Sequence, residues 1–263
     1  MVVLDQIMEA LKSPIVNMIG VHGTSGVGKT MLVKEVKRKA KQDSLLFPTV
    51  VTTKVTKNRE LKKIQEDIAC GLGMDQISFT ELTDQQVADR IRARLLKEKK
   101  FLIILDDVWE TEIALEEIGI PSASGLRQPI DRKNEISSSS EEHPVTCKIL
   151  LISEERDVLL RRMDSEYHQV FEVCKLEPDE SWELFKKTIG DDVETPDLQH
   201  LAEEIVEKCL GLPAAIVSVA NAMRGKTQLY EWKDALLSLK NPSPDGISAA
   251  IYKAIELLKK KKI

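Results

Sequence analysis

The chain has 263 residues, of which 42% are hydrophobic and 31% charged, a composition that suits one large or two small globular domains. Its net charge of −5 gives no electrostatic footprint for nucleic acid, and no run of about 18 apolar residues offers a membrane span. The four cysteines are scattered and form no CxxC pair, so the sequence suggests neither a zinc site nor a disulfide framework. With no signal-peptide pattern at the N-terminus, we expect a cytoplasmic protein.

Over the first two thirds of the chain, apolar runs alternate with amphipathic segments. Five runs predict strands, at residues 15–21, 48–55, 101–105, 147–152 and 169–173. Between them, the helical periodicity of residues 30–42 places apolar side chains on one face. Near-continuous apolar strands separated by helices predict a parallel sheet covered on both faces.

Local signals mark several boundaries in this region. Asn58 predicts the start of a helix that Gly71 ends, and Thr83 with Gln86 three residues later has the pattern of a capping box. Residues 122–146 are rich in serine and lack periodicity, which predicts a mobile surface loop.

From Pro178 onward the pattern becomes entirely helical. Proline suits a first helical turn, and it opens two predicted helices at Pro178 and Pro196. Two more helices are predicted at 212–223 and 229–239. We therefore predict a nucleotide-binding domain at 1–176, a helical subdomain at 177–241, and a linker with the start of a further element at 242–263.

The strongest motif is the glycine-rich segment 23–30, GTSGVGKT, which fits GxxxxGK[ST] between a predicted strand and a predicted helix. Its backbone amides close around phosphate oxygens, which leaves no room for side chains at the glycines. Lys29 is expected to reach the β- and γ-phosphates, and the Thr30 hydroxyl to bind Mg²⁺. A glycine turn without a ligand is the alternative, but such a match in this context is rarely empty. The predicted nucleotide-binding residues of this P-loop are Gly23, Thr24, Ser25, Gly26, Val27, Gly28, Lys29 and Thr30.

A pair of acids ends the apolar run FLIIL at 101–105. Asp106 is placed as a Walker-B aspartate, which holds Mg²⁺ mostly through water. Asp107 is the candidate catalytic residue, because it could orient or deprotonate the attacking water. Paired acids at a strand end can also simply cap a turn, but the P-loop favours the metal-binding interpretation.

Three other classes of P-loop protein are disfavoured. The chain contains no NKxD motif of GTPases, no LSGGQ segment of transporter ATPases and no arginine-rich lid of metabolite kinases. The sequence instead resembles the NB-ARC module of plant nucleotide-binding, leucine-rich-repeat immune receptors, over residues 15–258. Five ordered motifs carry the resemblance: GVHGTSGVGKTMLVKEV at 20–36, KKFLIILDDVWE at 99–110, CKILLISEERDVL at 147–159, FEVCKLEPDESWELFKKTIG at 171–190 and CLGLPAAIVSVANAMRGK at 209–226.

The resemblance implies a P-loop NTPase α/β fold, a three-layer parallel sheet in the order 2-3-1-4-5, followed by a small all-α helical subdomain. It also implies a switch in which ADP holds the module closed and ATP opens it toward oligomers. Pro213 matches the proline of the GLPL segment, which packs near the adenine. The same proline could simply follow the helix stop at Gly211.

The sequence departs from the family at the strand-four motif, T-[ST]-R, whose arginine senses the γ-phosphate. Here the aligned residues are Ile152, Ser153 and Glu154, and a carboxylate repels that phosphate. Arg156 would substitute only if the loop shifted. The chain is also expected to stop before the winged-helix subdomain with its MHD motif.

These observations favour an ADP/ATP-binding switch module of a plant disease-resistance protein, at most a slow ATPase. Its expected ligands are an adenine nucleotide and Mg²⁺, and its expected partners are other receptors of this family or a second copy. One alternative is a non-catalytic interaction module that pairs with full-length receptors. Another is an efficient ATPase, which Asp106 and Asp107 would permit.

Overall fold

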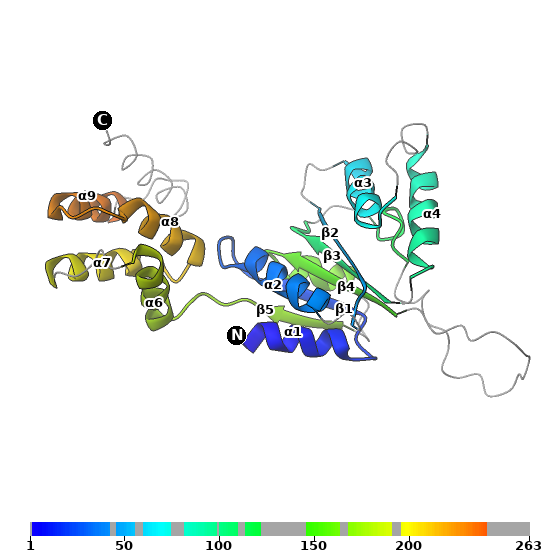
Figure 1. The fold of residues 1–263 in the computed structure, drawn as a ribbon, viewed down its shortest axis with the longest axis horizontal. Helices are drawn as coiled ribbons and strands as arrows, with labels where there is room; N and C mark the ends of the chain where they lie inside the picture. The colour runs from blue at the N-terminus through cyan, green and yellow to red at the C-terminus, as the bar shows by residue number, and fades with distance from the viewer. Residues whose placement is uncertain are drawn as a thin grey trace, which may run out of the picture. The chain divides into compact units, whose positions relative to one another are not determined.

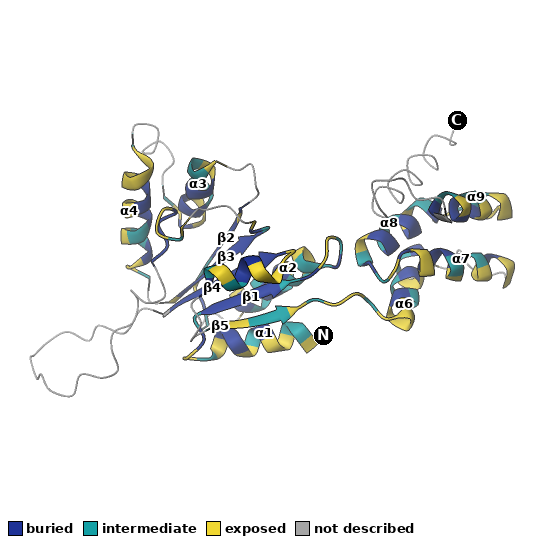
Figure 2. Cartoon of the chain, turned by 180° about the vertical axis from the view of Figure 1, so that it is seen from behind, coloured by how far each residue is buried: buried dark blue, intermediate teal, exposed yellow. Residues whose placement is uncertain are grey.

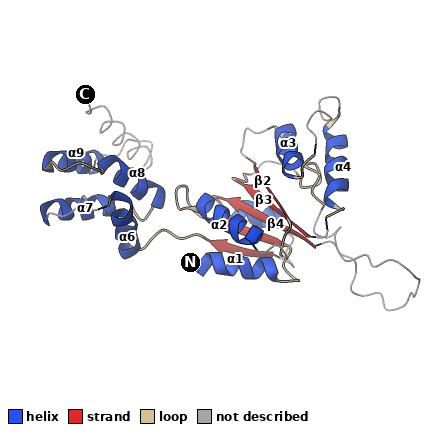
Figure 3. Cartoon of the chain, in the orientation of Figure 1, coloured by secondary structure: helices blue, strands red, loops and turns tan. Residues whose placement is uncertain are grey.

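The computed structural model describes residues 2–42, 46–55, 60–74, 82–98, 100–109, 114–121, 146–163, 168–190 and 196–240. By its contacts the chain divides into two compact units, one of residues 1–23 and 29–173, the other of residues 24–28 and 174–263. The first contains the sheet, whereas the second is helical in its described part (Figures 1 and 3). Asn58, the predicted loop up to residue 145, and the predicted linker at 242–263 lie outside the described residues.

The first unit is built on five parallel strands, and their order confirms the α/β class with a parallel sheet. The strands are β1 (Met18–His22), β2 (Thr49–Lys54), β3 (Lys100–Asp106), β4 (Thr146–Ser153) and β5 (His168–Glu172). They are hydrogen-bonded in the order β2-β3-β4-β1-β5. In the register, Val21 of β1 lies opposite Ile152, and Leu105 of β3 lies opposite Leu151.

This order corrects the predicted order 2-3-1-4-5, because β4 and not β1 pairs with β3. The sequence pattern could not separate the two possibilities. Strands β1, β3 and β4 are all short apolar runs that suit a position buried on both faces, and only the pairing decides which is the neighbour of β3. As a result, the carboxyl end of β4 emerges between the P-loop strand and the strand that ends at Asp106.

Helices cover both faces of the sheet, which makes the three layers (Figures 1 and 2). The helices of this unit are α1 (Val2–Lys12), α2 (Lys29–Gln42), α3 (Leu61–Gly71), α4 (Asp84–Leu95) and α5 (Arg156–Arg162). Alternate side chains of a strand point to opposite faces. Thus Ile104 joins the core beneath α1 and α2, whereas its neighbours Ile103 and Leu105 join the core beneath α3, α4 and α5.

Local signals succeeded at some helix ends and failed at others. The predicted capping box is present, with Thr83 Oγ1 accepting from the Gln86 amide and the Gln86 side chain accepting from the Thr83 amide. The cap predicted at Asn58 is wrong, because α3 begins at Leu61 with Glu60 at its N-cap and no side-chain bond there. Helix α1 was not predicted.

A buried lysine ties the segment after α1 to the sheet. Lys148 of β4 is 2% exposed, and its ammonium donates to the carbonyl oxygens of Ser13 and Val16. Burial lowers the pKa of Lys148 from 10.5 to about 8, while the neighbouring Cys147 thiol raises it. Buried charges persist only where hydrogen bonds replace water, and here two carbonyls do so.

We expect the Lys148→Met variant to be destabilised by roughly 1–3 kcal/mol at neutral pH, since it leaves two carbonyls without their donor. The folded pKa of Lys148 lies below its unfolded value. Between about pH 8 and 10.5, the unfolded chain therefore binds one more proton than the folded chain. Over this range the free energy of unfolding of the wild type increases relative to that of the variant as pH rises. Burial raises the pKa of Cys209 to about 12, so this thiol lowers the free energy of unfolding as pH rises. It does so in the wild type and in the variant alike. Urea unfolding at several pH values measures this difference, with the change of an exposed lysine, Lys41→Met, as control. If the free energy of unfolding of the wild type and of Lys148→Met had the same slope against pH, the prediction would be contradicted.

The helical unit packs around one core of its own. Its described helices are α6 (Pro178–Ile189), α7 (Pro196–Lys208), α8 (Pro213–Met223) and α9 (Leu229–Lys240). Phe185, Ile216 and Trp232 are fully buried at its centre. As predicted, Pro178 and Pro196 open helices. Across the described residues, no helix combines the length and apolar character needed to cross a membrane.

Candidate functional site

The glycine-rich loop connects β1 directly to α2. Gly26 and Gly28 have φ values of +78° and +105°, a region that side chains other than glycine rarely adopt. The amide of Val27 donates to the carbonyl of Thr24 at 3.3 Å, and the Val27 side chain is buried. The buried side chain of Val27 therefore holds the loop in place, while its glycines allow a backbone that can surround an anion.

Lys29 is the first residue of α2, and its side chain turns back over the loop. Its Nζ donates to the carbonyl oxygen of Gly23 at 2.6 Å. Burial lowers the pKa of Lys29, against the charges of Glu154, then Asp106 and Asp107, which raise it. The first unit therefore brings together the predicted lysine, both predicted acids and Glu154.

Asp106 is the last residue of β3 and is only 8% exposed. Burial raises its pKa, opposed mainly by the charge of Lys54 and by the amide of Asp107, which donates to the carboxylate. A carboxylate that has lost water is a good partner for a cation. Thr30, the other predicted magnesium ligand, is exposed in the first turn of α2. Both donor types fit Mg²⁺.

Asp107 follows in an unusual backbone conformation, with φ of +61°. The indole Nε1 of Trp109 donates to its Oδ1 at 3.1 Å. Left-handed backbone at an aspartate often marks a functional turn. The structure thus orients the candidate catalytic carboxylate through Trp109, a residue to which the sequence assigned no role.

The ends of β3 and β4 are braced to each other. The Val108 amide donates to the Ile152 carbonyl at 2.7 Å, and the Ser153 hydroxyl donates to the Val108 carbonyl at 2.7 Å. The Ser153 oxygen also accepts from the Glu155 amide at 3.2 Å. Ser153 therefore fixes the turn that carries Glu154, a role that no signal in the sequence indicated.

Glu154 is the first residue after β4 and is exposed. Of the charges that act on Lys29, that of Glu154 has the largest effect. Arg156 begins α5 and is also exposed. The pKa of His22 is lowered mainly by burial, and the charge of Arg156 lowers it further. The carboxylate, not the guanidinium, is thus the principal charge beside the P-loop lysine.

Within the second unit, Pro213 is the first residue of α8. The next residue, Ala214, donates its amide to the carbonyl of Gly26 at 3.1 Å. Loop residues 24–28 belong to the same compact unit as the helices. The role of Pro213 beside an adenine stays a prediction.

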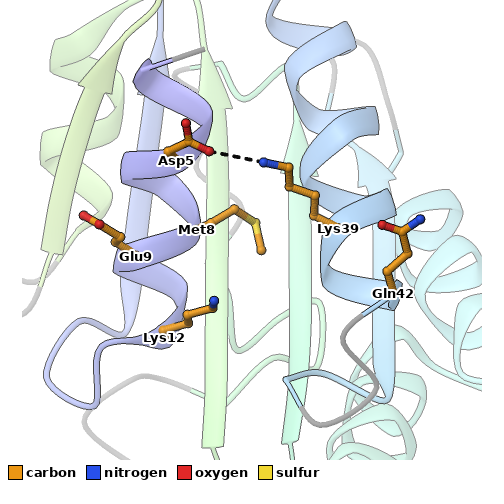
Figure 4. Close-up of a pocket in the computed structure, with 6 residues that line it drawn as sticks. All are labelled: Asp5, Met8, Glu9, Lys12, Lys39 and Gln42. Atoms are coloured by element: carbon orange, nitrogen blue, oxygen red, sulfur yellow. Dashed lines mark hydrogen bonds and ion pairs between the residues drawn. The ribbon is translucent and has the colours of Figure 1, made fainter.

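A groove of about 610 Å³ between α1 and α2 contains none of these residues. Figure 4 shows its lining, in which Lys39 and Asp5 form an ion pair at 3.2 Å. Its exposed side chains carry both signs of charge and belong to the outer surfaces of the two helices. It has neither the glycine loop nor the buried carboxylate, so the candidate site is the P-loop.

A parallel sheet whose first strand enters a glycine loop and a helix, and whose third strand ends at a buried aspartate, defines a P-loop NTPase fold. Solved structures agree on the fold. The Aeropyrum pernix ORC2 protein matches with a TM-score of 0.52 at 18% identity, covering 97% of this chain and 65% of that one. The ORC1 protein of the same organism matches with a TM-score of 0.50 at 15% identity, covering 98% and 76%.

Within this class, residues 2–130 match the NB-ARC domain, and the chain therefore carries a nucleotide-binding domain of the NB-ARC family. Its relatives in Arabidopsis thaliana are disease resistance proteins. The probable disease resistance protein At1g61300 is 33% identical over 235 residues, and the disease resistance protein UNI is 32% identical over 258. These alignments cover 89% and 97% of this chain but only 28% and 26% of the relatives, so the chain spans about a quarter of their length.

Proposed function

We propose that this chain is an ADP/ATP-binding switch module of a plant disease-resistance protein, with weak or absent ATP hydrolysis. The observation that carries the proposal is the P-loop lysine, Lys29, with the carboxylate of Glu154 as the strongest charge acting on it. Within the same proposal, residues 1–176 form the nucleotide-binding domain, residues 177–241 the helical subdomain, and the protein acts in the cytoplasm.

Phosphate binding follows from the loop and the helix behind it. The amides of residues 23–30 and the N-terminus of α2 favour an anion. On binding, the Lys29 ammonium would exchange the Gly23 carbonyl for phosphate oxygens, a stronger, charge-assisted bond. Support by analogy comes from the ORC2 protein of the same fold, whose structures are ADPNP–ADP and ADP complexes.

Thr30 and Asp106 would hold Mg²⁺, which would neutralise phosphate charge when bound. Asp107 would orient the attacking water, held in place by Trp109. Phosphoryl transfer depends on neutralising the charge that develops on the γ-phosphoryl oxygens. Glu154 supplies the opposite charge at this edge of the site, so turnover should be slow.

We expect ADP to bind at least as tightly as ATP. The β-phosphate of ADP meets the loop and Lys29, whereas the added γ-phosphate meets Glu154. Isothermal titration of each nucleotide with excess Mg²⁺ gives the two dissociation constants. A clear preference for ATP would contradict the proposal, and binding of neither nucleotide would leave the non-catalytic interaction module as the better account.

A further inference from the structure

The helical unit contains a second pocket, of about 490 Å³, between α6 and α7. Its wall is formed by the first turns of α6 and the last turns of α7, with the turn that follows α7. This volume lies in the range of sites that hold small ligands or peptide side chains. The residues that matter for its chemistry are Asp179, Ser181, Trp182, Glu203, Glu207 and Leu210.

Ser181 presents an unsatisfied hydroxyl at this pocket. The residue is 3% exposed, and its Oγ has no hydrogen-bond partner among the described residues. Its amide is already used, donating to the Glu177 carbonyl at 2.8 Å. Buried hydroxyls are almost always hydrogen-bonded, so a pocket-lining hydroxyl without a partner indicates that an occupant supplies one.

The rim of the pocket is acidic. Glu203 and Glu207 are one turn apart on α7, and Asp179 of α6 lines the same pocket. Like charges at this spacing repel, and they lie toward the negative end of the α7 dipole. Gln199 donates to Glu203 at 2.9 Å, but the described residues that line the pocket include no lysine or arginine. The rim therefore favours a cation.

Apolar side chains form the rest of the wall. The Trp182 ring is held by stacking on Phe185, with ring centroids 5.7 Å apart. Leu210 is 47% exposed and has a φ of +50°, at a helix end where glycine or asparagine is usual. A large apolar side chain is thus kept open to solvent beside the acids. The matching ligand is amphipathic, with a charged end and an apolar part.

We propose that this pocket binds an arginine side chain of a partner peptide, with an apolar neighbour of that arginine seated on Trp182 and Leu210. The planar guanidinium has five donors in a fixed fork. It can bridge the Glu203 and Glu207 carboxylates and still donate to the Ser181 hydroxyl, which a compact ammonium cannot do equally well. The site lies within the helical unit and does not depend on the proposed nucleotide function.

The test uses the full chain and two synthetic peptides, acetyl-Leu-Arg-Leu-amide and its citrulline analogue, which has the same shape without the charge. We expect the arginine peptide to bind at least about ten-fold more tightly and to shift the Trp182 indole N–H resonance in NMR titrations. Equal affinities for the two peptides, or shifts that avoid Trp182, would overturn the proposal.

Variants assign the effect to the pocket. The exposed double change Glu203→Gln and Glu207→Gln should abolish the preference for arginine, and Ser181→Ala should weaken binding severalfold. Asp197→Asn removes a carboxylate from the same helix, outside the pocket, and should bind like the wild type. Circular dichroism verifies that each variant is folded. A double variant that keeps the preference would show that the arginine binds elsewhere.

Discussion

Replacing Lys29 by alanine is expected to lower the affinity for both ADP and ATP by about 10²–10⁴-fold. Each charge-assisted hydrogen bond to a phosphate contributes roughly 1.5–3 kcal/mol, and in the proposed site we expect the lysine to contact two phosphates. In the structure its Nζ donates to the Gly23 carbonyl at 2.6 Å, a hydrogen bond within the loop itself. The fold should therefore survive the change while the phosphate site does not.

Lys34→Ala is the matched control, because Lys34 is an exposed lysine on the same helix. It removes the same charge from α2 without touching the loop and should bind nucleotide like the wild type. Isothermal titration with Mg²⁺·ADP and Mg²⁺·ATP measures both variants. If Lys29→Ala retained wild-type affinity, the nucleotide would have to bind elsewhere on the chain.

Replacing Glu154 by arginine is expected to have the second large effect, and it should change the affinity for ATP more than the affinity for ADP. The change converts a negative charge near Lys29 into a positive one, and a unit charge about 5 Å away contributes roughly 3 kcal/mol at an effective dielectric of 20. We expect the affinity for ATP relative to ADP to rise at least about ten-fold, with turnover also increasing. Glu154→Gln should give an intermediate result.

The neighbouring Glu155 supplies the control for this change. It is exposed, and its side chain makes no capping hydrogen bond to α5. Glu155→Arg alters the net charge identically but should leave the ratio of ATP to ADP affinity unchanged. An equal response of the two variants would mean that the effect is a general charge effect and that Glu154 has no specific role beside the γ-phosphate.

Much of the fold could be predicted because its signals are local. A glycine loop between an apolar run and an amphipathic helix determines the backbone at residues 23–30, and prolines start the helices at Pro178 and Pro196. The NB-ARC family and the parallel-sheet class followed from such motifs. Helix α1 was not predicted, although its buried residues Ile7, Ala10 and Leu11 have helical spacing.

Long-range pairing was beyond the sequence. Two apolar runs as similar as β1 and β4 have no local feature that assigns which of them is the neighbour of β3. The burial of Lys148 within such a run depends on carbonyls 132 and 135 positions away. In the same way, the brace from Ser153 to Val108 joins segments that are adjacent only in the folded sheet.

The position of β4 limits how an arginine could take the place of Glu154 beside Lys29. The strand is hydrogen-bonded along both edges, to β1 and to β3. If Arg156 were to reach the place of Glu154 by a slide of the strand, β4 would have to move by two residues, roughly 6.6 Å, which would break its present register with both neighbours and pull Lys148 from its carbonyls. An arginine at position 154 itself would place a cation beside the P-loop lysine without moving β4 or Lys148.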